Sequence, residues 1–183
     1  MSLPADGSAP GPTSDDGVGG AGVAGVRMGI DVGSVRVGVA LSDPRGVLAH
    51  PVTTVAPDEV ARIVDLIGAE DVVCVYVGLP RTLRGDEGPA AATVRGYAQS
   101  LSTLVAPVPV RLVDERLTTV TAHRQLESSG VRERGRRPVI DQAAAVLILQ
   151  GALDLESSSG RPAGELVHRG RKPRHARKRK DHV

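Results

Sequence analysis

The sequence is poor in aromatic and sulfur-containing side chains. It has no phenylalanine, no tryptophan, two tyrosines and one cysteine among 183 residues. A single cysteine excludes an intramolecular disulfide, and the place of Cys74 in the apolar run 72–77 predicts a buried thiol. Apolar residues make up 40% of the chain, so one core can form, packed mainly from valine, leucine, isoleucine and alanine. The length predicts a single domain.

Long apolar runs are also missing. None approaches the roughly 20 residues that a membrane-spanning helix needs. The first residues, MSLPADGSAP, lack the basic and apolar regions of a secretory signal. Together with the unpaired cysteine, these absences predict a cytoplasmic protein without a membrane partner.

Basic charge is absent from one end of the chain and concentrated at the other. Residues 1–25 contain three Asp and no Lys or Arg, and their Gly, Pro, Ser and Ala content predicts a disordered N-terminal segment. Residues 168–183 contain eight Lys or Arg and one Asp. We therefore place the folded domain at 26–156 and predict a flexible basic tail at 157–183, which suits contact with nucleic acid or the ribosome.

Residues 27–42 predict two strands joined by a two-residue turn at Gly33-Ser34, because apolar residues alternate along both arms. Asp31 interrupts the first arm. A carboxylate in an apolar strand must be hydrogen-bonded, ion-paired or bound to a metal, since an isolated buried charge is very costly. The nearby Gly29, Gly33 and Gly38 allow another backbone or a phosphate to approach. The alternative is that Asp31 only caps a turn.

The rest of the folded part alternates between strand-like and helix-like patterns. The predicted strands are 47–55, 72–78 and 108–113, and the predicted helices are 58–69, 89–104, 117–127 and 139–155. Three antiparallel strands would thus be followed by two parallel strands that join through helices. This order predicts an α/β fold with a five-stranded mixed sheet flanked by helices.

Acidic residues lie at the expected functional edge of this sheet. Asp114 and Glu115 end the last predicted strand, Asp141 opens the last helix, and Asp31 lies near the same edge. Carboxylates that converge need a cation, and oxygen ligands suit Mg²⁺ or Mn²⁺. Two such ions about 4 Å apart can activate water and stabilise the leaving oxygen in phosphodiester hydrolysis. Taken singly, each acid could instead cap a helix or pair with an arginine.

Four stretches resemble the YqgF/RuvX family of RNase H-like Holliday junction resolvases. They are GIDVGSVRVGVALSDP, VGLPRTLRGDEGP, VDERLTT and IDQAAAVLILQGAL, in the family's order across residues 27–155. The resemblance implies an RNase H-like fold, dependence on a divalent metal and cleavage of nucleic-acid phosphodiester bonds. It implies two substrates, namely four-way DNA junctions and the 5′ end of pre-16S rRNA.

Carried onto this chain, the resemblance makes Asp31, Glu115 and Asp141 the catalytic residues and metal ligands. Strand alternation leaves open whether Asp114 or Glu115 faces the metal, and the resemblance favours Glu115. An arginine-containing loop after the fourth strand is expected to cover the scissile phosphate. The residues expected to contact the substrate are Gly33, Arg36, Arg81, Arg84 and Arg116. The alternatives are that Arg36 is a solvated strand residue and that Arg81 and Arg84 belong to an ordinary exposed loop.

Two other functions fit parts of the pattern. Residues 31–36 also resemble the first phosphate loop of actin-like ATPases and sugar kinases, but those proteins need two such domains around a nucleotide. A non-catalytic ribosome-assembly factor could use the basic tail, but the complete set of acids argues against a degenerate site. We therefore predict a metal-dependent nuclease acting on branched DNA or precursor rRNA. A resolvase that cuts two strands symmetrically would act as a homodimer.

Overall fold

A computed structural model describes residues 24–82, 84–115 and 136–168, without the side chains of residues 136–141. In chain order its elements are β1 (Val26–Val32), β2 (Val37–Ser42), β3 (Ala49–Val55), α1 (Val60–Ala69), β4 (Val72–Leu79), α2 (Pro89–Leu104), β5 (Val110–Asp114), α4 (Arg136–Ser159) and β6 (Glu165–Leu166). Within these ranges, no helix has the length and apolar character needed to cross a bilayer.

The strands form one mixed sheet in the order β3-β2-β1-β4-β5-β6. β1 pairs antiparallel with β2 and parallel with β4, and β5 continues the parallel part. The predicted α/β class and mixed sheet are confirmed, but the predicted count of five strands is wrong. The additional strand, β6, pairs antiparallel with β5 over two positions, which is too short for its sequence to show a periodic pattern.

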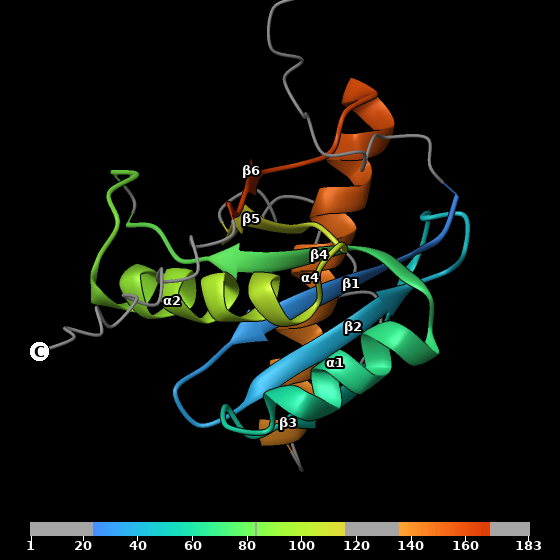
Figure 1. Ribbon diagram of the computed structural model, residues 1–183. Coiled ribbons are helices and arrows are strands. Elements are labelled where there is room, and N and C mark those ends of the chain that lie inside the picture. The colour runs from blue at the N-terminus through green and yellow to red at the C-terminus, as the bar shows by residue number, and fades with distance from the viewer. Residues whose placement is uncertain (1–23, 83, 116–135, 169–183) are drawn as a thin grey trace, which may run out of the picture.

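Helices cover both faces of the sheet, with α1 and α2 on one face and α4 on the other (Figure 1). Alternate residues of a strand point to opposite faces. In β1, Met28 and Ile30 are fully buried in the core shared with α1 and α2. Gly29 faces α4, where an added Cβ would lie 2.6 Å from Leu149 Cβ. The close approach predicted at this glycine is therefore made by a helix and not by a phosphate.

Some boundaries differ from those predicted. The turn between β1 and β2 has four residues, 33–36, because β1 ends at Val32 and β2 begins at Val37. The flexible tail predicted from residue 157 is wrong at its start, since α4 continues to Ser159 and β6 follows. The predicted helix 117–127 and nearly all of the predicted disordered segment lie outside the described residues.

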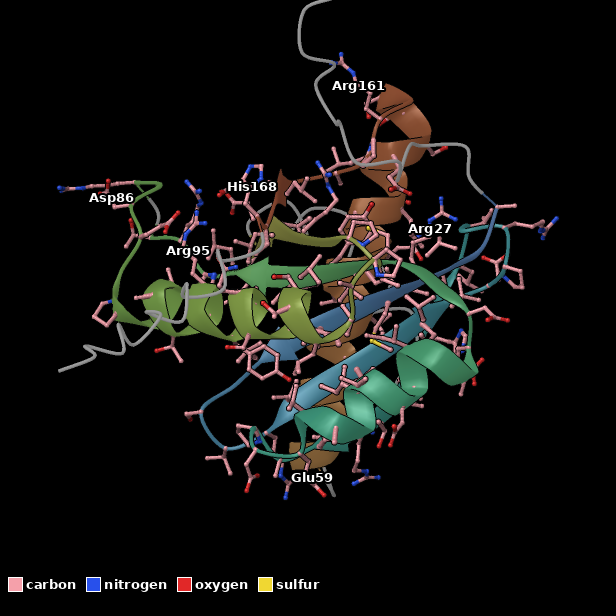
Figure 2. The ribbon with its side chains drawn as sticks, in the orientation of Figure 1. Arg27, Glu59, Asp86, Arg95, Arg161 and His168 are labelled. Carbon is pink, nitrogen blue, oxygen red and sulfur yellow. The ribbon has the colours of Figure 1, made fainter. Side chains whose placement is uncertain are left out.

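A buried polar cluster ties the end of α4 to the sheet. Arg27 Nε lies 3.3 Å from Glu156 Oε2, with side chains only 6% and 9% exposed, and the Tyr76 hydroxyl donates a hydrogen bond to Glu156. Cys74 on the same face is buried as predicted, and this burial raises the pKa of its thiol to about 11. Figure 2 shows Arg27 at the end of the molecule opposite the loop that carries Asp86. The ion pair of Arg27 and Glu156 therefore lies away from that loop, and Tyr76 reaches it from within β4.

Candidate active site

Asp31 lies near the end of the central strand β1 and on the face that α4 covers. It pairs with Gly38 of β2 in the antiparallel ladder. It shares its face with Gly29, two residues earlier, which contacts Leu149 and the carbonyl oxygen of Ala145 in α4. The only acid of β1 thus lies on the face toward α4. It comes two residues after Gly29, where the strand approaches the helix closely.

Glu115 follows β5 and lies over the neighbouring strand β4. A Cβ at Gly78 would be 3.2 Å from Glu115 Oε1 and 2.4 Å from Ile148 Cδ1 of α4. Gly78 is the residue after Val77, which pairs with Ile30 of β1, so Gly78 lies level with Asp31 across the sheet. The missing side chain at Gly78 makes room for the Glu115 carboxylate beside Asp31 and for α4 above it.

The electrostatics of Glu115 show that carboxylates gather here. Burial raises the pKa of the Glu115 carboxyl above its usual range, and the negative charges of Asp31 and Asp114 raise it further. Like charges held close together favour the protonated form of one partner unless a cation neutralises them. The donor set is oxygen only, which fits a hard divalent cation such as Mg²⁺ or Mn²⁺.

Asp114 belongs to the opposite face of the sheet. Its neighbour by alternation, Leu112, packs into the core under α1 and α2. The Asp114 carboxylate faces Arg81, with Oδ2 3.8 Å from Nε. The structure therefore brings Glu115, and not Asp114, onto the face of Asp31. Alternation in the sequence had left open which of the two acids shares that face.

The backbone places Asp141 in α4, but its side chain lies outside the described ones. It occupies the position one turn before Ala145, whose carbonyl oxygen contacts Gly29. Among the described side chains, no three His, Cys, Asp or Glu residues form a group that could hold a metal ion. Participation of Asp141 in a site with Asp31 and Glu115 stays a prediction.

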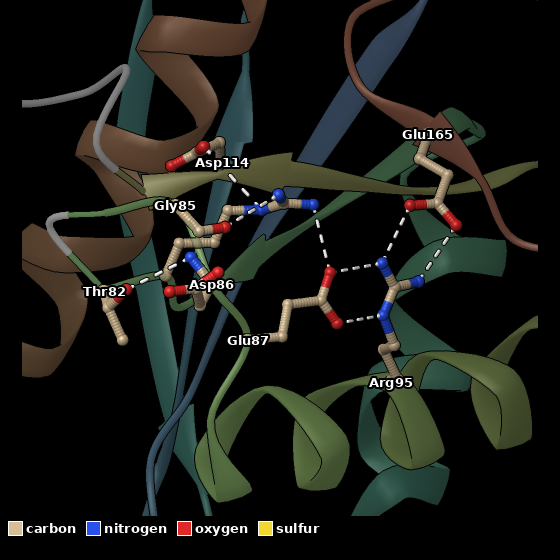
Figure 3. A network of polar contacts seen from close by, with 8 residues as sticks. Thr82, Gly85, Asp86, Glu87, Arg95, Asp114 and Glu165 are labelled. Atoms are coloured by element: carbon tan, nitrogen blue, oxygen red, sulfur yellow. Dashed lines mark hydrogen bonds and ion pairs between the residues drawn. The ribbon is translucent and has the colours of Figure 1, made fainter.

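The loop between β4 and α2 is fastened by ion pairs (Figure 3). Glu87 accepts hydrogen bonds from Arg95 Nε at 2.7 Å and from Arg81 Nη2 at 3.0 Å. Arg95 also donates to both carboxylate oxygens of Glu165 in β6, at 2.9 Å each. Arg81 is thus engaged by Glu87 and Asp114, which fastens the loop, and its predicted contact with the substrate stays a prediction.

The other residues predicted to contact the substrate differ in their exposure and in the bonds that they make. Arg36 and Arg84 are exposed, and neither makes a side-chain hydrogen bond or ion pair with another residue in the described part of the chain. Gly33 closes the β1–β2 turn, because its N–H donates to the Arg36 carbonyl at 2.9 Å. Arg116 lies outside the described residues.

The sequence reasoning missed two features of this site. One is Gly78, whose only signal was a glycine at the end of a buried strand. The other is the bridge from Glu87 through Arg95 to Glu165, which joins residues up to 78 positions apart and has no local signal. Gly78 makes room for Glu115, and the bridge fastens the loop. Each depends on residues that are brought together only when the strands pair.

The raised pKa of Glu115 predicts an effect on stability. The stabilisation linked to its proton is complete below the ordinary glutamate pKa and is lost as the pH rises through the raised value. At pH 7 without divalent metal, Glu115→Gln should therefore raise the melting temperature, by about 2 °C. The difference should shrink below pH 4, and Glu70→Gln, at an exposed glutamate, should change little. A lower melting temperature for Glu115→Gln at pH 7 would contradict the electrostatic account.

Comparisons with known proteins agree with this fold and with a nuclease family. Residues 25–155 match the family described as RuvX, Holliday junction resolvase. Three relatives carry the name "Putative pre-16S rRNA nuclease". The protein of Streptomyces coelicolor is 55% identical over 147 residues, covering 78% of this chain and 88% of its own. The protein of Nocardioides sp. is 56% identical, with coverage of 79% and 97%. The protein of Rhodococcus opacus is 58% identical, with coverage of 74% and 80%.

Solved structures share the architecture at low sequence identity. RuvC of Thermus thermophilus in complex with a Holliday junction substrate aligns with a TM-score of 0.54 and 17% identity. The alignment covers 75% of this chain and 99% of RuvC. A second Thermus thermophilus RuvC structure gives the same TM-score. At this identity the likeness concerns the fold, and it supports the RNase H-like class.

Proposed function

This chain belongs to the RuvX family of Holliday junction resolvases, and we propose that it is a divalent-metal-dependent endonuclease acting on structured nucleic acid. The observation that carries the proposal is the placement of Asp31 and Glu115 on one face at the carboxyl end of the parallel strands. Burial raises the pKa of the Glu115 carboxyl there, and the charge of Asp31 raises it further. A site built this way is adapted to bind a cation rather than to stabilise the fold.

We assign the metal-binding role to Asp31, Glu115 and Asp141, with two ions as the expected number. A bound divalent cation would supply an activated water and neutralise charge on the phosphate oxygens. Asp31 lies on the central strand β1, and Glu115 directly follows β5, where Gly78 of the neighbouring strand β4 leaves room for its carboxylate. The exposed guanidinium groups of Arg36 and Arg84 are placed to neutralise the substrate backbone.

Two substrates are supported by different observations. The names of the relatives that are 55–58% identical favour precursor 16S rRNA. The description of the matching family favours a four-way DNA junction. Symmetric cleavage of a junction would require a homodimer, whereas trimming one RNA strand would not. A junction substrate would therefore imply a homodimer, and an RNA substrate would be compatible with a monomer.

A side-by-side cleavage assay tests the function. The purified protein is incubated at low salt with Mg²⁺ or Mn²⁺ and with a labelled four-way DNA junction or a 5′ precursor fragment of 16S rRNA. Cleavage that stops on addition of EDTA is the expected result. Paired nicks in the junction would establish a resolvase, and cleavage of the RNA alone would establish rRNA maturation. Metal-independent cleavage, or none of either substrate, would overturn the proposal.

Arg36 offers a separate test of the binding surface. Arg36→Ala should weaken binding of either substrate in metal-free buffer and lower the slope of log Kd against log salt concentration by about 1, because one phosphate contact is lost. The melting temperature should not change, since Arg36 is exposed and makes no side-chain hydrogen bond or ion pair with another described residue. Arg62→Ala, at a 58% exposed side chain on α1, is the matched control and should leave the slope unchanged. Equal slopes for all three proteins would remove Arg36 from the interface.

A further inference from the structure

The connection between β1 and β2 carries an exposed valine close to the candidate active site. Val35 is 74% exposed, more than any other exposed large hydrophobic side chain among the described residues. It lies four residues after Asp31, between the exposed residues Ser34 and Arg36. A single exposed apolar side chain is ordinary on a protein surface. What distinguishes Val35 is its position beside Asp31 and the firmly held turn that carries it.

The base of this connection is firmly held. The Gly33 N–H donates to the Arg36 carbonyl at 2.9 Å, and Val32 pairs with Val37 in the ladder directly below. Val37 is fully buried, so β2 cannot slide without exposing the core. The β-branched side chain of Val35 itself has few χ1 rotamers. The valine is therefore presented to solvent in a restricted direction.

The surroundings of Val35 favour the apolar part of a nucleotide. The carboxylates of Asp31 and Glu115 attract cations, and Arg36 is the cationic neighbour that can contact a phosphate. Val35 adds only apolar surface, which suits the face of a base or a sugar. Four extended residues span at most about 14 Å. Because stacked nucleotides rise about 3.4 Å each, such a base lies within a few nucleotides of a phosphate bound at Asp31.

We propose that Val35 packs against a nucleobase beside the cleaved phosphate, holds it out of the stack and thereby favours strands in which that base unstacks at low cost. Branch points and junctions between duplex and single strand meet this condition, because unstacking costs least for an unpaired base. The inference rests on the proposed nuclease function, since the metal-binding acids define which nucleotides lie beside the turn.

The test uses 2-aminopurine at the branch point of a four-way junction and of a branched RNA, because its fluorescence rises when the base unstacks. Binding is followed at saturating protein without metal, so the readout does not require cleavage. Val35→Ser is compared with Val47→Ser, the matched control at a 60% exposed valine in the turn after β2. Wild type and Val47→Ser should raise the fluorescence of at least one of the two probes, and Val35→Ser should not. The shape-conserving Val35→Thr should be intermediate.

Cleavage then separates this inference from the function on which it rests. Val35→Ser should lower the ratio of kcat/KM for a branched substrate over that for a plain duplex about fivefold. If Val35→Ser raises the fluorescence as wild type does, or if wild type raises neither, the role of Val35 is overturned even when cleavage is normal. If the fluorescence depends on Val35 but no substrate is cleaved, the contact stands and the proposed nuclease function fails.

Discussion

Replacing Asp31 with Asn, or Glu115 with Gln, should lower the rate of metal-dependent cleavage by at least about 10³-fold. Each change removes one negative charge from the pair of acids that shares the α4 face, to which we assign the metal. Asp114→Asn should retain cleavage within about fivefold, because Asp114 lies on the face opposite to Asp31 and faces Arg81, with Oδ2 3.8 Å from Nε. The measurement is the initial cleavage rate of the preferred substrate at saturating Mg²⁺ or Mn²⁺.

Two controls make this comparison specific. Asp65→Asn, on the exposed side of α1, should cleave at the wild-type rate. The melting temperatures of the four variants should show that all are folded, and Mg²⁺ should raise that of wild type but not of the Asp31 variant. If Asp114→Asn is inactive while Glu115→Gln cleaves normally, the assignment of the metal ligand to Glu115 is wrong.

Glu156→Gln should be the most destabilising of the substitutions considered for this chain. It leaves the Arg27 guanidinium buried without its counter-charge, although the amide can still accept the Tyr76 hydrogen bond. Breaking one side of a buried ion pair costs about 3–5 kcal/mol, a large part of the roughly 5–15 kcal/mol that separates folded from unfolded domains. The melting temperature should fall by roughly 10 °C.

Asp154→Asn is the matched control for this loss, because Asp154 lies on the same helix but is exposed and bonded only to Gln150 among the described residues. Its free energy of unfolding, measured by urea denaturation, should stay within about 0.5 kcal/mol of wild type. A change of less than about 1 kcal/mol for Glu156→Gln would mean that Arg27 finds another partner or reaches water. Since Arg27 and Glu156 lie at the end of the molecule opposite the loop that carries Asp86, the folded fraction of Glu156→Gln should keep its cleavage activity.

The architecture was largely predictable because its signals are local. The helix at 89–104 and the buried strand from residue 72 were predicted within one residue, since apolar periodicity and Pro89 mark them directly. The buried state of Cys74 followed from its apolar neighbours in the same way. The turn at 33–36 was predicted two residues too short, because the exposed Val35 continues the alternation of β2 without belonging to it.

The sequence predicted which acids belong to the candidate site, but it did not predict how their side chains and those of the nearby arginines lie relative to one another. Asp31 stands out in its own strand, where a carboxylate breaks an apolar pattern. Arg81 carried an equally clear signal for a substrate contact, yet Glu87 and Asp114 engage it. Its partners lie six and 33 residues away, and the second contact forms only because β4 and β5 pair in parallel. The sequence identifies a charged residue that could bind substrate, but the fold determines which residues pair with it.

By itself, the sequence determined the fold class, the order of most elements and the acids from which a metal site is proposed, because each depends on the chemistry of a few neighbouring residues. Only the tertiary structure showed that Glu115, and not Asp114, shares the face of Asp31. Adjacent strand residues point to opposite faces, so a shift of one position exchanges them. Pairing with β4 sets that position, and Gly78 provides the space that Glu115 occupies. That choice is made by residues more than 30 positions away, and no local pattern contains it.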